Sequence, residues 1–175
     1  MSRITKSALP EAAFLGKYEA IEGGYTDCYA ASLSQDVSLQ AFIGAFFDTP
    51  VFRLERLLLR LFFGQRTSRA DVSALAAAST DHLAAWRVEE RSAGQVLLRV
   101  GDGPIRTWLM CEGASGETRL YFGSALLPLA KDAQGRPKMA LLFRATLWFH
   151  QLYSRILLAA TLRALRRPQT LRATT

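Results

Sequence analysis

Residues 139–166 read MALLFRATLWFHQLYSRILLAATLRALR, and this stretch decides how the rest of the chain can fold. It contains no proline or glycine, and Pro168 follows it. The stretch therefore predicts one continuous helix of about 42 Å, at 1.5 Å per residue. A helix of this length needs a large partner surface, because its apolar side must be buried against another layer of secondary structure.

The two sides of this helix differ in polarity. Successive residues lie about 100° apart around a helix, which places Arg144 and Arg155 on one side. The opposite side is apolar except at its middle, where it carries Thr146, His150 and Tyr153. Packing alone gives no reason for polar groups at that position, so we expect this side of the helix to line a ligand cavity.

The preceding residues supply the partner surface. YTDCYAASL at 25–33 predicts a first strand, and apolar runs predict two short helices at 39–47 and 51–63. Glycine-containing turns then separate four further predicted strands, at 83–91, 95–100, 105–112 and 117–127. Residues 66–80 predict a loop with at most one turn of helix.

This order predicts an α+β fold, in which a curved antiparallel sheet wraps around the long C-terminal helix. The two short helices after the first strand close one end. We expect an irregular N-terminal arm at 1–20, a single domain at 21–167 and a C-terminal tail at 168–175. A chain of 175 residues with 50% apolar residues suits one domain with a substantial core.

Charge and composition limit the partners. The net charge is +7, and no acidic residue follows Asp132. Weak attraction to an anionic surface is physically allowed, but a solvated basic helix face is the simpler interpretation. We expect no nucleic acid partner and either a monomer or a homodimer. The first residues do not resemble a signal peptide and no apolar run reaches about 20 residues, so we expect a cytoplasmic protein without a membrane span.

Five segments together resemble a known fold family. They are YTDCYAASL at 25–33, VFRLERLLLRLF at 51–62, AAWRVEER at 84–91, IRTWLM at 105–110 and FHQLYSRILLAATLR at 149–163. Their order over 25–167 resembles the helix-grip fold of the START-like (SRPBCC) superfamily, which includes polyketide cyclases and lipid carriers. More specifically, the chain is similar to an uncharacterised bacterial family within that group. The resemblance implies an internal pocket for an apolar small molecule, and it implies no single reaction.

Glu55 and His150 are the candidate catalytic residues. Glu55 lies in the middle of the apolar face of the second predicted helix, where its ionised form is costly unless it is paired. It could act as a general acid or base, or it could form an ion pair with Arg106 or Arg119. His150 could act as a base or bind a ligand carbonyl, although a lone interior histidine is commonly structural.

The remaining candidate ligand-binding residues come from the strand at 105–112. Arg106 and Trp108 lie on one side of this strand, and Thr107 and Leu109 lie on the other, without a signal for which side faces inward. Trp108 could stack on a ligand or belong to the core. The full predicted ligand set is Glu55, Arg106, Trp108, Thr146, His150 and Tyr153. In the first strand, we expect Asp27 to be solvated.

No catalytic or cofactor motif is present. The sequence lacks GxSxG, a Walker A loop, HExxH and a GxGxxG that follows a strand. Two histidines and two cysteines without ligand spacing predict no metal site, and we expect no cofactor and buried free thiols at Cys28 and Cys111.

Three functions remain open. The first is binding of an apolar small molecule without a reaction. The second is a cyclase- or lyase-type enzyme that uses Glu55 and His150 as acid and base. The third is a peripheral membrane or partner-binding protein that uses Trp148, which we expect on the outer side of the long helix.

Overall fold

A curved sheet of seven antiparallel strands forms the centre of the protein. The computed structural model describes residues 3–53, 67–131, 134–135, 137–138 and 141–166. Across the sheet the strand order is β1-β2-β7-β6-β5-β4-β3. The strands are β1 (Thr5–Lys6), β2 (Tyr25–Leu33), β3 (His82–Leu83), β4 (Trp86–Arg91), β5 (Gln95–Val100), β6 (Ile105–Ala114) and β7 (Glu117–Leu126). The predicted α+β class with a curved antiparallel sheet and a long C-terminal helix is confirmed.

Strand pairing explains how distant residues meet. Strands β4 to β7 form a meander of consecutive hairpins, and β2 pairs with β7 although about 90 residues separate them. The register of this pair places Asp27 opposite Ser124. Residues directly opposite each other in an antiparallel pair point to the same face, so both side chains lie on one side of the sheet.

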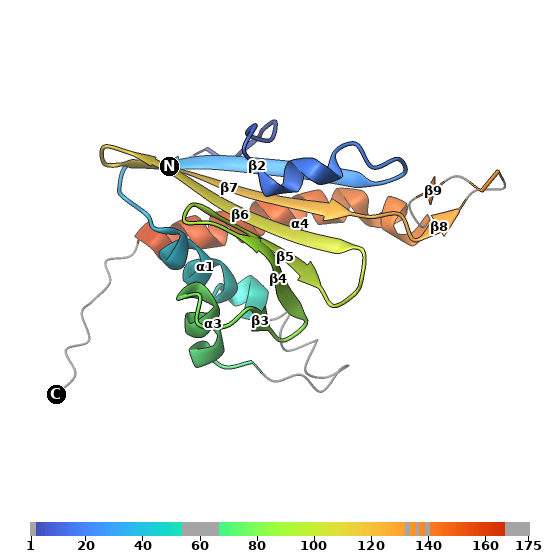
Figure 1. Cartoon of the computed structure of the whole chain (residues 1–175). Coiled ribbons are helices and arrows are strands. Elements are labelled where there is room, and N and C mark those ends of the chain that lie inside the picture. Colours follow the sequence, from blue (N-terminus) through green and yellow to red (C-terminus); the bar gives the residue numbers. More distant parts are fainter. Residues whose placement is uncertain (1–2, 54–66, 132–133, 136, 139–140, 167–175) are drawn as a thin grey trace.

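Three α-helices carry labels in the described part of the chain. They are α1 (Leu39–Phe47), α3 (Arg69–Ala76) and α4 (Leu141–Arg166). The first begins at Ser38, whose hydroxyl accepts from the amide of Ala41. Of the second predicted helix at 51–63, residues 51–53 are helical, and its remaining residues lie outside the described part. Figure 1 shows α1 and α3 together at one end of the sheet, where α1 also packs against α4.

The helix α3 is longer than the single turn that the sequence predicted. It begins with a capping box, in which the Ser68 hydroxyl accepts from the amide of Asp71 while the Asp71 carboxylate accepts from the amide of Ser68. The signal was present in the sequence as Ser68-x-x-Asp71, since a capping box can have Asp or Glu at its fourth position.

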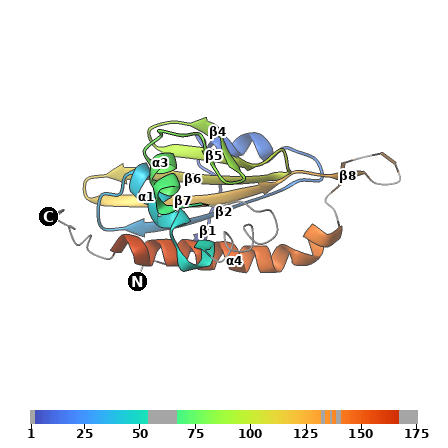
Figure 2. The ribbon, with the colours of Figure 1, turned by 90° about the horizontal axis from the view of Figure 1, so that it is seen from below.

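Both faces of the sheet are covered, by different parts of the chain. Figure 2 shows α4 on one side of the sheet and the blue helical turn of the N-terminal arm on the other. We call the side toward α4 the inner face; its core includes Phe46, Leu109 and Leu158. The outer face lies under the arm and its 3-10 helix η1 (Phe14–Tyr18), and its core includes Leu15 and Trp108.

A small separate sheet pairs β8 (Ala130–Lys131) with β9 (Pro137–Lys138), just before α4. Within the described ranges, no helix has the length and hydropathy needed to cross a membrane.

Candidate functional site

A cavity of about 360 Å³ lies between α4 and the inner face of the sheet. Its apolar wall comes from α1, the residues after it, the sheet and α4, and includes Phe46, Phe52, Trp86, Val100, Ile105, Phe122, Leu126, Phe149 and Leu157. Its polar side chains are Thr107, Ser124, His150, Tyr153 and Ser154. A mostly apolar cavity with a few polar groups is the usual composition of a small-molecule site.

The aromatic side chains of this wall support one another. The rings of Phe46 and Phe122 have centroids 4.9 Å apart, and those of Phe52 and Trp86 are 5.0 Å apart. Aromatic pairs at these distances favour tilted or edge-on geometries, which are what these pairs adopt. The rings therefore pack mainly against each other, and they leave the space beside α4 open.

The polar end of the cavity is organised around Asp27, which the sequence predicted to be solvated. That prediction was wrong, because only 3% of Asp27 is exposed. Its Oδ1 accepts from the Ser124 hydroxyl at 2.6 Å and from the Ser124 amide at 3.2 Å. Its Oδ2 accepts from the Tyr25 hydroxyl at 3.2 Å. These three hydrogen bonds offset the cost of burying the carboxylate.

His150 joins this group from α4. Its Nε2 lies 2.8 Å from Ser124 Oγ and 3.7 Å from Asp27 Oδ2. The single hydroxyl hydrogen of Ser124 is already donated to Asp27, so Ser124 can only accept from His150. This arrangement requires a proton on Nε2. In the neutral imidazole Nδ1 is then the acceptor, and it has no hydrogen-bond partner among the described residues.

Tyr25 contacts both Asp27 and His150. Gln151 Nε2 donates to the Tyr25 hydroxyl at 3.0 Å, and the Tyr25 ring meets the His150 ring edge-on with centroids 6.2 Å apart. Burial, together with the nearby negative charge of Asp27, raises the pKa of Tyr25 to about 12. Tyr25 therefore remains a hydrogen-bond donor to Asp27 over the physiological pH range.

Ser154 lies one helical turn after His150 and was missed by the sequence argument. It is fully buried, it lines the cavity, and its hydroxyl has no hydrogen-bond partner in the described part of the chain. Thr161, also fully buried on α4, instead donates to the carbonyl of Leu157 at 2.8 Å. The side of α4 that is buried is centred nearer Ser154 and Leu158 than the sequence predicted. Because the predicted side was centred on His150 and Tyr153, Ser154 was not among the predicted residues.

Two of the three polar residues predicted on the inner side of α4 line the cavity, and the side chain of the third is not described. His150 and Tyr153 both line the cavity, and the Tyr153 ring stacks on Phe149 with centroids 6.4 Å apart. The Thr146 side chain lies outside the described part of the structure. Glu55 also lies outside the described residues, so its role stays a prediction.

Arg106 and Trp108 do not reach the cavity, which corrects the predicted ligand set. Both lie on the outer face, because it is Thr107 and Ile105 of β6 that face α4. Trp108 is fully buried there, and its Nε1 donates to Gln95 Oε1 at 2.8 Å. Its role is packing, which was the alternative that the sequence left open.

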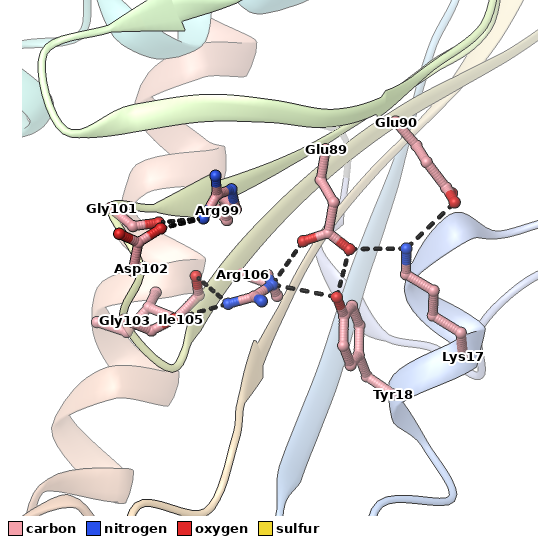
Figure 3. Close-up of polar contacts among 10 residues, drawn as sticks. All are labelled: Lys17, Tyr18, Glu89, Glu90, Arg99, Gly101, Asp102, Gly103, Ile105 and Arg106. Atoms are coloured by element: carbon pink, nitrogen blue, oxygen red, sulfur yellow. Dashed lines mark hydrogen bonds and ion pairs between the residues drawn. The ribbon is translucent and has the colours of Figure 1, made fainter.

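Arg106 belongs to a polar cluster that fastens the N-terminal arm to the outer face (Figure 3). Its Nε lies 2.7 Å from Glu89 Oε2 and donates to the Tyr18 hydroxyl at 3.1 Å. Lys17 Nζ lies 2.7 Å from Glu89 Oε1, which also accepts from the Tyr18 hydroxyl. These partners show that Arg106 and Glu89 hold the arm in place, on the side of the sheet that faces away from the cavity.

The outward side of α4 carries exposed apolar residues. Trp148 is 69% exposed, which confirms its predicted position, and Phe149, Leu152 and Ile156 are about half exposed. Phe149 also lines the cavity, so the cavity approaches the surface at this residue.

The two cysteines are free, as predicted. Cys28 is buried on the outer face and Cys111 is partly buried against the inner core. Burial raises the pKa of both thiols to about 12, which leaves them protonated and unreactive as nucleophiles.

Other hollows have different characters. A surface groove of about 630 Å³ beside β1 and β2 is bordered by Arg3, Arg119 and Arg166, and another of about 860 Å³ runs along α1. Both are larger and more open than the cavity, and among the described residues neither is lined by a buried polar side-chain atom without a partner. In the described ranges, no three histidine, cysteine or acidic side chains cluster in a way that could hold a metal ion.

Comparison with known proteins adds no assignment: no protein-family model, no curated protein and no solved structure matches this chain.

Proposed function

We propose that this protein binds an apolar small molecule in the cavity between α4 and the inner face of the sheet. The supporting observation is the cavity itself, at about 360 Å³ and walled mainly by aromatic and aliphatic side chains. Natural cores are packed without voids of this size, because every unfilled volume forfeits packing energy. A volume above about 300 Å³ is also within the usual range of small-molecule sites.

We further propose that the chain belongs with the START-like proteins. The resemblance read from the sequence and the arrangement of a long helix across a curved sheet support this placement. A place in that superfamily accords with ligand binding, and it specifies neither the ligand nor a reaction.

A fluorescent apolar probe tests the binding function. N-phenyl-1-naphthylamine is neutral and gains fluorescence in apolar surroundings, so titration of the protein should give saturable enhancement. Val100→Phe adds bulk to the cavity wall and should weaken probe binding about tenfold or more. Val88→Phe is the matched control, because Val88 is also a partly buried strand valine but does not line the cavity.

Two results would contradict the proposal. One is the absence of saturable binding. The other is equal weakening by both valine variants, since that would locate the probe elsewhere. Native mass spectrometry of the protein purified from its own host would then show which compound, if any, is retained.

The Asp27–Ser124–His150 group favours a second candidate, an enzyme with His150 as a general base. A carboxylate that reaches the imidazole through a hydroxyl stabilises the imidazolium that forms when Nδ1 takes a proton. This role of Asp27 differs from the one predicted for Glu55, which was that of a general acid or base beside His150.

The two candidates differ in what the protein retains. If His150 catalyses a reaction, protein carrying His150→Phe should accumulate unreacted compound, so its retained mass differs from that of the wild type in native mass spectrometry. If the wild type and His150→Phe retain compounds of the same mass, the result favours binding without a reaction. Equal probe binding by the two proteins is the required control.

A further inference from the structure

Three features meet at the α4 end of the cavity, and none of them fits a purely apolar ligand. We infer that the natural ligand carries a hydroxyl group, and that this hydroxyl binds between Ser154 and His150 while the apolar remainder lies among the aromatic side chains. This inference rests on the proposed binding function and adds the chemical class of the ligand.

The first feature is the Ser154 hydroxyl. It is fully buried and has no hydrogen-bond partner among the described residues, although it lines the cavity. A buried hydroxyl without a partner destabilises the folded protein, and an alanine at this position would avoid that cost. A serine also readily bonds the carbonyl one turn before it in a helix, as Thr161 does in α4, but Ser154 makes no such bond. Its hydroxyl is therefore available to a ligand.

The second feature is the tautomer of His150. Because Ser124 donates its only hydroxyl hydrogen to Asp27, the hydrogen bond between Ser124 Oγ and His150 must come from Nε2–H. Neutral His150 then presents Nδ1 as an acceptor. A ligand group that bonds neutral His150 at Nδ1 must be a donor.

The third feature is spacing. His150 and Ser154 are four residues apart on α4, so they are neighbours on one face of the helix, and both line the same cavity. A hydroxyl can donate to Nδ1 and accept from Ser154 through the same oxygen. An ether or a carbonyl can only accept. An anionic group is disfavoured by the Asp27 carboxylate, which lies behind His150 at 3.7 Å from its Nε2.

Three matched naphthalene probes test the inference by displacement of N-phenyl-1-naphthylamine. They are 2-naphthol, which donates and accepts, 2-methoxynaphthalene, which only accepts, and 2-methylnaphthalene, which does neither. Ser154→Ala should weaken 2-naphthol roughly three- to tenfold, the value of one net hydrogen bond, and leave 2-methylnaphthalene unchanged or slightly tighter. His150→Phe should weaken 2-naphthol by a similar factor without weakening 2-methoxynaphthalene, because only the donated hydrogen bond is lost.

Thr161→Val is the matched control. It removes a hydroxyl from the same helix at a buried position outside the cavity, and should change the affinity of none of the three probes. Thermal unfolding of each variant confirms that binding is compared between folded proteins.

The possible outcomes distinguish a failure of the hydroxyl inference from a failure of the proposed binding function. If N-phenyl-1-naphthylamine does not bind the wild type, the proposed function has failed. If it binds but Ser154→Ala affects 2-naphthol and 2-methylnaphthalene equally, the cavity binds ligands and the hydroxyl inference is wrong. Selective weakening of 2-naphthol in both Ser154→Ala and His150→Phe, with none in Thr161→Val, supports it.

Discussion

Trp86 and Trp108 belong to the same sheet, with one strand between theirs, and lie on its opposite faces. On the outer face, Trp108 is enclosed by the N-terminal arm, and its indole N–H is satisfied by Gln95. On the inner face, Trp86 packs against Phe52 and borders an open cavity. The outer face is filled and the inner face is not, although the inner face has the longer covering element.

The buried polar groups on the two faces differ in the same way. Gln95 on the outer face uses both ends of its amide, since Oε1 accepts from Phe14 and Trp108 and Nε2 donates to Ala12. On the inner face, Ser154 makes no hydrogen bond and His150 uses Nε2 alone among the described partners. Gln95 is thus satisfied within the protein and Ser154 is not. The contrast holds for these two side chains and not for every buried polar atom, because Glu89 Oε2 and Arg91 Nε also lack a hydrogen bond among the described residues, although Glu89 Oε2 lies 2.7 Å from Arg106 Nε.

The largest expected effect sharpens the comparison between the tryptophans. Trp108→Ala should destabilise the protein by about 3–5 kcal/mol, because a fully buried ring is lost from close packing together with its hydrogen bond. Trp86→Ala should cost about 1–2 kcal/mol less, since the ring already borders empty space. Urea unfolding of the two variants measures both values. Equal costs would show that the inner face is packed as tightly as the outer.

The next prediction compares the buried polar groups. Gln95→Ala should cost about 2–3 kcal/mol, because it leaves the Trp108 indole N–H and two backbone groups of the arm without partners. Ser154→Ala in the ligand-free protein should be neutral or stabilising, because no hydrogen bond is lost. A clear loss of stability in Ser154→Ala, measured by the same unfolding experiment, would indicate that its hydroxyl is satisfied and would break the contrast.

A smaller effect concerns the cluster that holds the arm to the outer face. Burial alone raises the pKa of the Glu89 carboxyl, but hydrogen bonds from Lys17 and Tyr18 and the charge of Arg106 outweigh burial and lower this pKa below its ordinary value. A group with a lowered folded-state pKa adds stability above its unfolded pKa, and that stability is lost as the pH falls through the folded value.

Glu89→Gln should therefore cost about 1 kcal/mol at neutral pH, and the difference from the wild type should shrink as the pH falls below about 4. Unfolding measured as a function of pH tests this. Glu90→Gln is the control, because Glu90 is more exposed and, among the described residues, its side chain pairs with Lys17 alone, at 3.2 Å. A cost for Glu89→Gln that is constant with pH would exclude a contribution from its charge.

The smallest expected effect lies outside both faces of the sheet. Trp148→Ser should change stability by less than about 0.5 kcal/mol, since Trp148 is 69% exposed. The same variant tests the peripheral-membrane alternative by sedimentation with anionic vesicles at low and high salt. Salt-sensitive binding that Trp148→Ser weakens would support that alternative, and the absence of binding in the wild type would remove it.

Local signals predicted much of the fold. The bounds of β2, α1 and β5 agree with the predicted elements, because glycine turns, a serine cap and Asp48-Thr49-Pro50 mark these elements in the sequence. The elements that the prediction missed or shortened include β1, β8 and β9, which are two residues long each, and α3, whose capping box was overlooked. They depend on short signals that compete with loop-like composition.

The candidate site was predicted only in part. His150 and Tyr153 were found because they interrupt an apolar helix face, and that signal is contained in the helix itself. Asp27 was missed because its partner Ser124 is 97 positions away and joins it only through the pairing of β2 with β7. Arg106 and Trp108 were assigned to the ligand set because both sides of β6 are rich in apolar residues.

By itself, the sequence determined the class of fold, the long helix with two unlike sides, and the presence of polar groups on the side that is buried. Those properties follow from periodicity, turns and caps, which act between residues close together in the chain. Only the tertiary structure decided which face of the sheet meets α4, and hence that Ser124 and His150 reach a buried carboxylate while Trp108 does not reach the cavity. The physical reason is that both faces of this sheet are buried, so alternation along a strand shows which residues share a face but not which element covers that face.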